Sequence, residues 1–440
     1  MLRLGRSKSA RAGIRAALLA GAAVAAVGLS AGSASAAPLC NGTNIIGQGS
    51  SLQKIAQQNV WAPAFSSEVC NSGSHPTVTY ESTGSGAGLK EWNSDGKRGS
   101  LNHERQFIGT DDAPTAEQIT NITSVAGGAS LAVIPVAQTS ISIDANPPTG
   151  CTVEVITNAD LQRVFRGSYL QWSQIATAEG GSACEAPITR VVRKDGSGTS
   201  YQLKNYLYKI STTKMNCTVG NTEGKATWQE LEPIINAETG APNTTWPESC
   251  KAQVLSPVVR PAGTGGGEEV KMVNATAGSI GYAALPDAKS NSAVDILSVQ
   301  NNGQKPLLEA TFASPALGTE ANCLETLYVV PVQGRNVEGS TGLNVDWSQV
   351  FGASPSTGGE RYPLCTLTYD LAFHGYKAAG FPTPTKEETT VHDYLREYIA
   401  LGGQAQLASS GTFYAPLPST GGGIINVLSA AKFAGSKISP

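Results

Sequence analysis

Short apolar runs alternate along the chain with glycine-rich turns and with segments of helical periodicity. Apolar, β-branched runs predict strands, and apolar positions spaced by three or four residues predict helices. The predicted strands cover residues 43–46, 77–80, 106–108 and 189–192. The predicted helices cover residues 52–65, 160–165 and 201–208, and another begins at 89–92. This alternation is typical of an α/β architecture with mostly parallel strands, in which ligands bind beyond the carboxyl ends of the strands.

The remaining segments are less regular. Residues 130–136 form a β-rich apolar run, 327–332 and 364–373 are strand-like, and 389–401 has a helical pattern. A polar, irregular stretch at residues 211–254 carries Cys217 and Cys250 and is interpreted as an insertion. No internal repeat is visible, which argues against solenoid and propeller architectures.

Residues 1–36 have the pattern of a signal peptide. Basic residues precede an alanine-rich apolar run at 17–29, and Ala34-Ser35-Ala36 supplies the small-residue pattern that signal peptidase requires. We predict cleavage before Ala37 and export to the periplasm or the extracellular space. Cys40 lacks a small residue directly before it, so we expect no lipid anchor. No later stretch approaches the 18 apolar residues of a membrane span, so we expect no stable membrane insertion.

Loss of the signal peptide makes the chain more acidic. It removes five of the 31 basic residues and none of the 34 acidic ones, which leaves 26 against 34, a net charge of −8. An acidic chain is a poor bulk electrostatic partner for nucleic acid, so we expect none. Any bound anion must then be held by local groups. We expect a monomer without a cofactor.

All eight cysteines lie in the mature part of the chain. An even number of cysteines in an exported protein indicates disulfides, although eight cysteines allow 105 connectivities. We predict that neighbours along the chain pair: Cys40–Cys70, Cys151–Cys184, Cys217–Cys250 and Cys323–Cys365. A structural metal site would need close spacings such as C-x2-C, and the chain has none.

Three strand-to-helix turns carry hydroxyl residues beside glycines: Ser50 with Ser51, Ser85, and Ser197 with Thr199. Glycine lets backbone N–H groups approach a ligand, and a hydroxyl at a helix N-terminus can donate a hydrogen bond to an oxyanion. Serine and threonine before a helix are also ordinary N-caps, so a single turn of this kind is weak evidence.

The third turn is more specific than the others. Arg193 lies four residues before Ser197 at the end of a predicted strand, and Asp195 lies between them. A guanidinium can bind two oxygens of a tetrahedral anion while a carboxylate holds it in place. A surface Arg–Asp pair is the alternative. The segment is no nucleotide P-loop, because it lacks a Gly-Lys-Ser/Thr ending.

Four segments together resemble the ligand-contacting segments of the phosphate-binding proteins that serve bacterial ABC uptake transporters. They are residues 47–52 (GQGSSL), 83–88 (TGSGAG), 108–114 (IGTDDAP) and 191–200 (VVRKDGSGTS), in the family's order and approximate spacing. Residues 277–282 (AGSIGY) resemble the family's return crossing between lobes, and 414–418 (YAPLP) resemble the start of its last helix.

The resemblance implies a two-lobed, type II periplasmic-binding-protein fold, α/β in each lobe, with a hinge and a ligand cleft between the lobes. Lobe 1 would comprise residues 37–135 and 283–440, and lobe 2 residues 136–282, including the insertion. The implied function is binding of inorganic phosphate in the cleft for uptake through an ABC transporter permease. No enzymatic activity is expected.

The resemblance also implies the phosphate contacts. They would come from Ser51, the Leu52 backbone, Ser85, Asp112, Arg193, Ser197, Gly198 and Thr199. Asp195 would orient Arg193. The family usually has Phe-Pro where this chain has Leu52-Gln53, but a backbone N–H survives a change of side chain, so only the pocket wall differs.

Asp112 carries the argument for selectivity. Phosphate at neutral pH keeps at least one proton, which a carboxylate can accept, whereas sulfate offers none and would be repelled. A site built for a ligand hydrogen can reject the analogue that lacks it by several powers of ten. We therefore expect phosphate to be preferred over sulfate, whereas arsenate is not discriminated by this argument. The alternative role of Asp112 is a helix N-cap ahead of Ala113-Pro114.

Two other functions fit the exported chain. One is a secreted scavenging or surface protein that binds phosphate or another oxyanion without a transporter. The other is a phosphoesterase with Ser85 or Ser197 as nucleophile, which the histidines argue against. The four of them, His75, His103, His374 and His392, form no sequence cluster suited to a metal or a general base.

Overall fold

The computed structural model describes most of the chain after residue 40. The described residues are 41–67, 75–210, 215–219, 222–226, 243–246, 255–291, 293–301, 311–323, 328–329, 347, 350–351, 361–399, 401–409, 411–418 and 427–438. The predicted signal peptide, residues 1–36, lies outside this part of the chain. So do Cys40, Cys70 and Cys250, and most of the predicted insertion.

A twelve-stranded mixed sheet forms the centre of the described chain. Its main path runs β2-β1-β3-β17-β4-β10-β6-β9. The bounds are β1 Ile45–Gly49, β2 Val78–Ser82, β3 Phe107–Thr110, β4 Leu131–Asn146, β6 Thr189–Val191, β9 Val258–Val259, β10 Ser279–Ala284 and β17 Cys365–Phe373. β5 (Val155–Ile156), β11 (Asp295–Gln300), β12 (Phe312–Ala313) and β18 (Tyr414–Ala415) pair off this path.

The strands are parallel only toward the two ends of the path. β1 pairs in parallel with β2 and β3, and β6 with β10 and β9. In the middle, β17 is antiparallel to β3 and β4, and β4 is antiparallel to β10 and β11. The expectation of mostly parallel strands is therefore wrong for the centre of the sheet. The pattern could not show this, because β17 meets β4 from more than 200 residues away in sequence.

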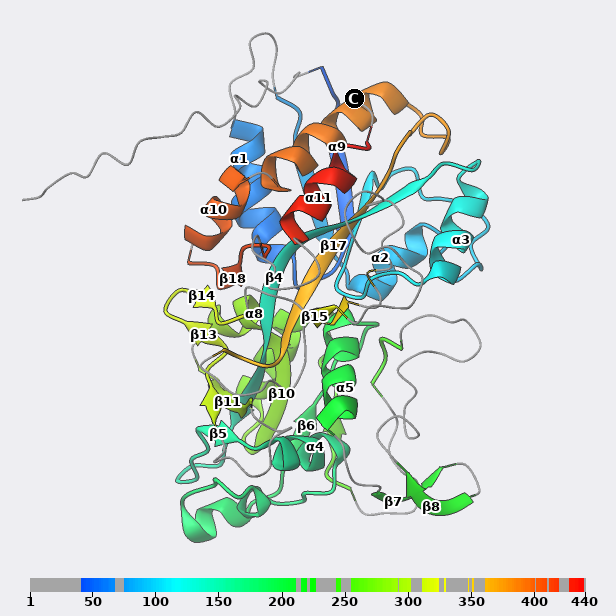
Figure 1. The fold of residues 1–440 in the computed structure, drawn as a ribbon. Helices are drawn as coiled ribbons and strands as arrows, with labels where there is room; N and C mark the ends of the chain where they lie inside the picture. The colour runs from blue at the N-terminus through cyan, green and yellow to red at the C-terminus, as the bar shows by residue number, and fades with distance from the viewer. Residues whose placement is uncertain are drawn as a thin grey trace, which may run out of the picture. The chain divides into compact units, whose positions relative to one another are not determined.

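β4 is the strand that joins the two parts of the sheet. Its first residues pair with β17, from Leu131 opposite Phe373, and its last residues pair with β10, to Asn146 opposite Ser279. Figure 1 shows β4 running from α9 (Pro384–Ile399) and α11 (Val427–Gly435) at one end to β10 and β11 at the other. The apolar run predicted at 130–136 is only the first half of this strand.

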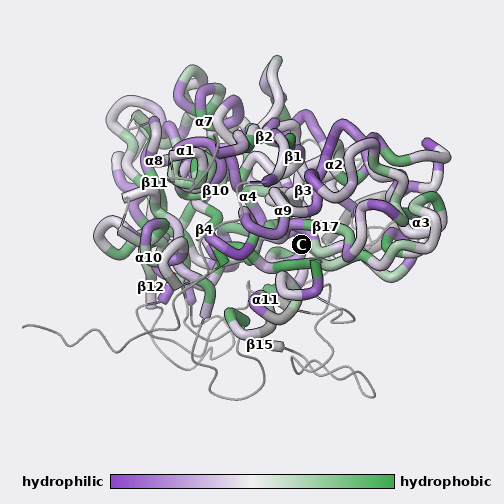
Figure 2. The backbone as a smooth tube through the Cα atoms, turned by 90° about the horizontal axis from the view of Figure 1, so that it is seen from above, coloured by the Kyte–Doolittle hydropathy of each residue, from purple (hydrophilic) through white to green (hydrophobic). Residues whose placement is uncertain are grey.

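The helices flank the sheet. The remaining ones are α1 Ala62–Ser67, preceded by a π-helical turn at Ala56–Trp61, α2 Ser85–Glu91, α3 Ala116–Val125, α4 Asn158–Arg166, α5 Gly198–Ile210, α7 Gly266–Ala275, α8 Leu285–Lys289 and α10 Leu401–Ser409. Viewed from above, α2 and α3 lie on one side of β4 and β17, and α8 and β11 on the other (Figure 2). The sequence pattern missed α3, α7, α8 and α10, and the helix predicted to begin at 89–92 begins at Ser85 and ends at Glu91. It could have found α3 from the capping box that Thr115 and Gln118 form at its start.

Short structures complete the described chain. They are the strand pairs β7 Met215–Val219 with β8 Thr222–Ala226, β13 Ala316–Leu317 with β14 Glu320–Ala321 and β15 Tyr328–Val329 with β16 Val350–Phe351, and the 3-10 turns Trp172–Gln174 and Gly181–Glu185. β15 falls within the strand predicted at 327–332, whose other residues lie outside the described part.

Two large hydrophobic clusters and a smaller one around Val270 and Val273 form the core of the described residues. The first contains Trp92 and Phe107, and the second contains Trp172 and Tyr206. β4 contributes Ala137 to the first cluster and Ile141 to the second. Residues of β11 pack in the second cluster, although the predicted lobe boundary at residue 283 would place them in lobe 1. The division into lobes 37–135 with 283–440 and 136–282 stays a prediction.

Two disulfides are present in the described residues, Cys151–Cys184 and Cys323–Cys365. Both are pairs that neighbour pairing predicts. The predicted Cys40–Cys70 and Cys217–Cys250 pairs involve residues outside the described part of the chain. Among the described helices, none has the length and apolar character needed to cross a bilayer.

Candidate functional site

The turns that follow β1 and β3 lie side by side because the two strands are parallel neighbours. The Ser50 N–H donates to the Gly109 carbonyl at 2.8 Å. Gly49 has a φ of +141°, and a Cβ on it would lie 2.0 Å from the Gly109 carbonyl oxygen, so only glycine fits. This close approach brings the Ser50 hydroxyl onto Asp111, to which it donates a hydrogen bond.

Asp111 is the centre of the polar network, and sequence reasoning missed it. Its side chain is buried, and its two carboxylate oxygens have different partners. Oδ1 accepts from Ser50 and, at 3.0 Å, from Thr368 of β17. Oδ2 accepts from Ser85 at 3.3 Å and from Thr199 at 3.5 Å. Burial raises the pKa of Asp111, although hydrogen bonds from Ser50 and Thr368 and the charge of Arg193 oppose the rise.

Asp112 lies in the same turn with a free acceptor. Its side chain is 1 % exposed, and its Oδ1 accepts from Thr110 Oγ1 at 2.9 Å. Its Oδ2 has no hydrogen-bond partner among the described residues. Burial raises the pKa of Asp112 to about 7, against the hydrogen bond from Thr110, and the charge of Asp111 adds to the rise. A buried carboxylate with an unused oxygen is the group that a protonated oxyanion could satisfy.

The alternative role of Asp112 as a helix N-cap is wrong. The N-cap of α3 is Thr115, whose side chain accepts from the Gln118 N–H at 3.3 Å. The Gln118 side chain in turn accepts from the Thr115 N–H at 2.9 Å. Asp112 is therefore not needed to begin the helix.

Arg193 and Asp195 form a buried ion pair after β6. Arg193 Nε donates to Asp195 Oδ1 at 2.9 Å, and Nη2 donates to Oδ2. The two side chains are 2 % and 9 % exposed, so the alternative of a surface pair is wrong. Burial lowers the pKa of Arg193, but the charge and hydrogen bonds of Asp195 and the charge of Glu269 outweigh it and keep that pKa above its usual value. The ion pair restrains the guanidinium, and the predicted role of Asp195 in orienting Arg193 toward a ligand stays a prediction.

The first turn of α5 packs against the two aspartates. Ser197 Oγ accepts from the Ser200 N–H at 3.2 Å, which is N-cap geometry and leaves the hydroxyl proton able to donate elsewhere. A Cβ on Gly198 would lie 2.7 Å from Asp112 Oδ1 and 2.8 Å from Ser85 Oγ. The structure therefore brings Ser85, Asp112, Gly198 and Thr199 together from three separate segments.

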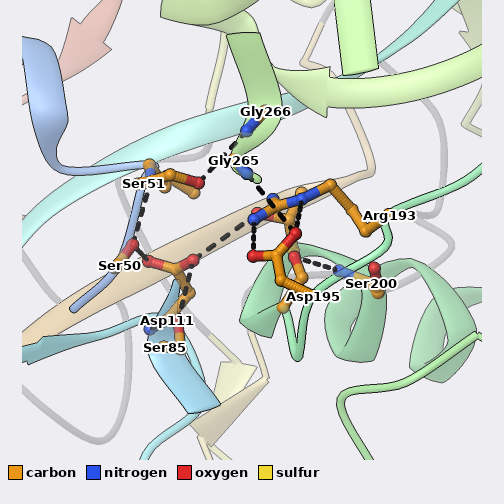
Figure 3. A network of polar contacts seen from close by, with 12 residues as sticks. Ser50, Ser51, Ser85, Asp111, Arg193, Asp195, Ser200, Gly265 and Gly266 are labelled. Carbon is orange, nitrogen blue, oxygen red and sulfur yellow. Dashed lines mark hydrogen bonds and ion pairs between the residues drawn. The ribbon is translucent and has the colours of Figure 1, made fainter. Parts of the chain in front are cut away.

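Ser51 and Leu52 have contacts of a different kind. Ser51 Oγ accepts from the Gly266 N–H at 3.2 Å, and the Leu52 N–H donates to Ser50 Oγ at 3.0 Å. The Gly265 N–H donates to Asp195 Oδ1 at 3.4 Å. The start of α7 thus joins the turn after β1 to the Arg193–Asp195 pair (Figure 3). Sequence reasoning missed this link, although the glycine-rich run at residues 263–267 marks a turn before a helix.

A protein-family model identifies the family of this chain. The model of the PBP superfamily domain matches residues 34–345. The chain belongs to this family. No curated protein matches the chain.

Several solved structures of phosphate-binding proteins have the same fold as this chain. A phosphate-binding protein from Stenotrophomonas maltophilia is 20 % identical, with a TM-score of 0.55 over 89 % of this chain and 93 % of that one. A high-affinity periplasmic phosphate-binding protein, PfluDING, is 19 % identical, with a TM-score of 0.55 and coverages of 86 % and 91 %. A human phosphate-binding apolipoprotein is 20 % identical, with a TM-score of 0.57 and coverages of 86 % and 92 %. The predicted α/β periplasmic-binding-protein fold is confirmed.

Gln53 stands where the phosphate-binding proteins that the sequence resembles usually have proline, and it has hydrogen bonds of its own. It is fully buried, and its Nε2 donates to Thr368 Oγ1 at 2.7 Å and to the Tyr369 carbonyl at 2.9 Å. Thr368 also donates to Asp111. The side chain of Gln53 thus ties the turn after β1 to β17, directly beneath Asp111.

A cavity of about 720 Å³ opens beside Ser51. Lys54 and Lys271 lie in its wall, together with Asp287 and the glycines at the start of α7. Glu268 lies in the wall as well, and Lys271 Nζ donates to Glu268 Oε1 at 2.6 Å, so the wall carries charges of both signs. In the part of the chain that the structure describes, no group of three or more His, Cys, Asp or Glu side chains could hold a metal ion.

Proposed function

We propose that this chain binds inorganic phosphate between the turns after β1, β2, β3 and β6. Arg193 supplies the positive charge, and Ser51, Ser85, Ser197 and Thr199, with the backbone of Leu52 and Gly198, supply hydrogen-bond donors. Asp195 holds Arg193 in orientation through both of its oxygens. This donor set matches a tetrahedral oxyanion, and it stands in an acidic chain, so local groups rather than net charge attract the ligand.

The observation that carries the proposal is the unpartnered Oδ2 of the buried Asp112. A carboxylate beside an anion is unfavourable unless the anion brings a proton. Phosphate at neutral pH carries one, and the hydrogen bond to Asp112 satisfies the buried oxygen. Sulfate would leave that oxygen unpaired and add repulsion, so phosphate is the oxyanion that this site favours.

The wider role follows from the same binding. We propose export after cleavage before Ala37, and delivery of phosphate from the periplasm or the extracellular space to an ABC transporter permease. Closing of two lobes around the ligand would give the transporter a form to recognise. A secreted scavenger without a transporter would need the same site. We propose no enzymatic activity, because among the described residues neither Ser85 nor Ser197 has a hydrogen bond to a histidine that could act as a general base.

The test is isothermal titration of the protein, stripped of ligand by unfolding and refolding, with phosphate and with sulfate. We expect tight phosphate binding, no sulfate heat, and at least about a tenfold loss of discrimination in Asp112→Asn. Asp370→Asn is the matched control, because Asp370 is also fully buried, its Oδ1 also has no partner among the described residues, and burial raises its pKa to about 7, yet it is not among the predicted phosphate ligands and its Oδ2 bonds Tyr398 and Gln57. Absence of phosphate heat in a folded sample would overturn the proposal.

A further inference from the structure

Asp111 accepts hydrogen bonds on two sides that differ in kind. The donors to Oδ1, Ser50 and Thr368, are not among the predicted phosphate ligands. The donors to Oδ2, Ser85 and Thr199, both are. Oδ1 thus holds the carboxylate in place within the protein. Oδ2 binds two of the hydroxyl groups that would hold the anion (Figure 3).

A hydroxyl has one proton to give. Ser85 Oγ donates to Asp111 Oδ2 and also accepts from the Asp111 N–H at 3.2 Å, so its donor is spent within the protein. Thr199 donates to the same oxygen over a longer distance of 3.5 Å. Neither hydroxyl can donate to Asp111 and to a phosphate oxygen through the same proton.

We propose that Asp111 is an internal competitor for the anion site, which lowers phosphate affinity by holding the hydroxyl protons of Ser85 and Thr199. The inference rests on the proposed phosphate binding. It gives the two adjacent aspartates different tasks. Asp112 selects the protonated anion, whereas Asp111 sets how tightly any anion is held, because an arriving ligand has to take the two donors from it.

Asp111→Asn separates the competitor from a structural role. The amide can keep an acceptor oxygen toward Ser50 and Thr368 while it places an NH2 group toward Ser85 and Thr199, where it no longer accepts. We expect about tenfold tighter phosphate binding and a parallel gain for sulfate, so that their ratio stays unchanged. A structural role predicts the opposite sign, because loss of the Asp111 network would loosen the site.

Ser85→Ala provides a second measurement that does not depend on the folding of Asp111→Asn. A serine whose proton is held by Asp111 contributes little to binding, so Ser85→Ala costs less than about threefold in the wild-type background. In the Asp111→Asn background the same change costs about tenfold, because the freed hydroxyl then donates to phosphate. Asp370→Asn, which removes another buried carboxylate, leaves phosphate affinity unchanged.

The outcomes are distinguishable by titration calorimetry, with thermal unfolding as a check that each variant is folded. Equal or weaker phosphate binding in a folded Asp111→Asn overturns the inference and leaves phosphate binding intact. A loss of more than about tenfold in Ser85→Ala alone also overturns it. If the wild-type protein binds no phosphate, the proposed function fails and the inference fails with it.

Discussion

At the end of β3 the chain places two adjacent carboxylates, and after β6 it places a guanidinium two residues before a carboxylate. We call residues 110–112 the acidic turn and residues 193–197 the basic turn. In the basic turn, Asp195 is matched by Arg193 through two hydrogen bonds. In the acidic turn no cation pairs directly with either aspartate within the described residues, and the donors are hydroxyls.

The difference separates two ways of handling a buried charge. An ion pair keeps both partners charged near neutral pH, and the hydrogen bonds between them fix the orientation of both side chains. Carboxylates without a cation have raised pKa values, so their charge depends on protons that a ligand can bring. In the proposed phosphate site, the basic turn would supply attraction and the acidic turn would favour an anion that carries a proton.

The largest expected effect comes from breaking the basic turn. Arg193→Met removes the buried cation. We expect phosphate affinity to fall at least about 100-fold, because the variant loses the two charge-assisted hydrogen bonds that the guanidinium is expected to donate to phosphate. Arg193→Lys keeps the charge but not the planar guanidinium that can bind two oxygens, so its phosphate affinity should lie between those of the wild type and Arg193→Met. Lys54→Met, in the wall of the cavity beside Ser51, is the control for loss of a cation and should cost less than about threefold. Titration calorimetry measures all three, and Arg193→Met binding within tenfold of wild type would contradict the comparison.

The second effect is a change of sulfate affinity with pH, which tests the role of the acidic turn. Burial raises the pKa of Asp112 to about 7, so the carboxyl is ionised at pH 8 and protonated at pH 5.5. A protonated Asp112 can donate to sulfate instead of repelling it. We therefore expect sulfate affinity to rise about tenfold between pH 8 and pH 5.5.

Asp112→Asn tests this assignment. The amide donates at every pH, so its sulfate affinity should stay nearly flat over the same range. If the wild type and Asp112→Asn gained sulfate affinity equally on acidification, the titrating group would lie elsewhere in the site.

The segments that form the candidate site could be predicted because they are encoded locally, whereas their contacts with a ligand stay predictions. The strand, glycine turn and helix units carry Ser85, Arg193 and Ser197 at their ends, and those segments are visible in the sequence. Asp111 differs from Asp112 only through donors far away in sequence, such as Thr368, 257 residues on. The Gly266 contact to Ser51 spans 215 residues, and the glycine-rich run at residues 263–267 indicates a turn without indicating what the turn contacts.

The same limit explains the fold. A parallel strand beside its own helix is a local unit, so β1, β2, β3 and β6 could be predicted, whereas the two-residue β9 could not. The antiparallel centre depends on β4 and β17, whose pairing brings Leu131 opposite Phe373. An apolar run such as β17 predicts a strand without indicating its partner or direction.

A third effect concerns stability. Burial raises the pKa of Asp112, Asp287 and Asp370 to about 7 and that of Asp144 to about 8. These groups bind protons more tightly in the folded than in the unfolded chain, so the unliganded protein loses stability as pH rises from about 4 to about 8. We expect a higher Tm at pH 5 than at pH 8.

The acidic turn should account for part of this slope. Asp112→Asn cannot ionise, so its Tm should fall less between pH 5 and pH 8 than that of the wild type. Asp195→Asn, in the basic turn, should instead lower the Tm at both pH values, because it leaves the buried Arg193 without its partner. A wild-type Tm that rises over this range would contradict the raised pKa values.

The smallest effect tests how the hydrogen bonds of Gln53 to β17 stabilise the acidic turn. Gln53→Met removes the hydrogen bonds to Thr368 and Tyr369 and should cost about 1–3 kcal/mol of unfolding free energy in urea titrations. Phosphate affinity should change less than about threefold, because Gln53 touches the site only through Thr368. Gln58→Met, an exposed glutamine that follows Gln53 by five residues and donates to the Tyr80 carbonyl at 2.8 Å, should cost less than about 0.5 kcal/mol. A large loss of affinity in Gln53→Met would mean that the position of Asp111, and not only its charge, depends on β17.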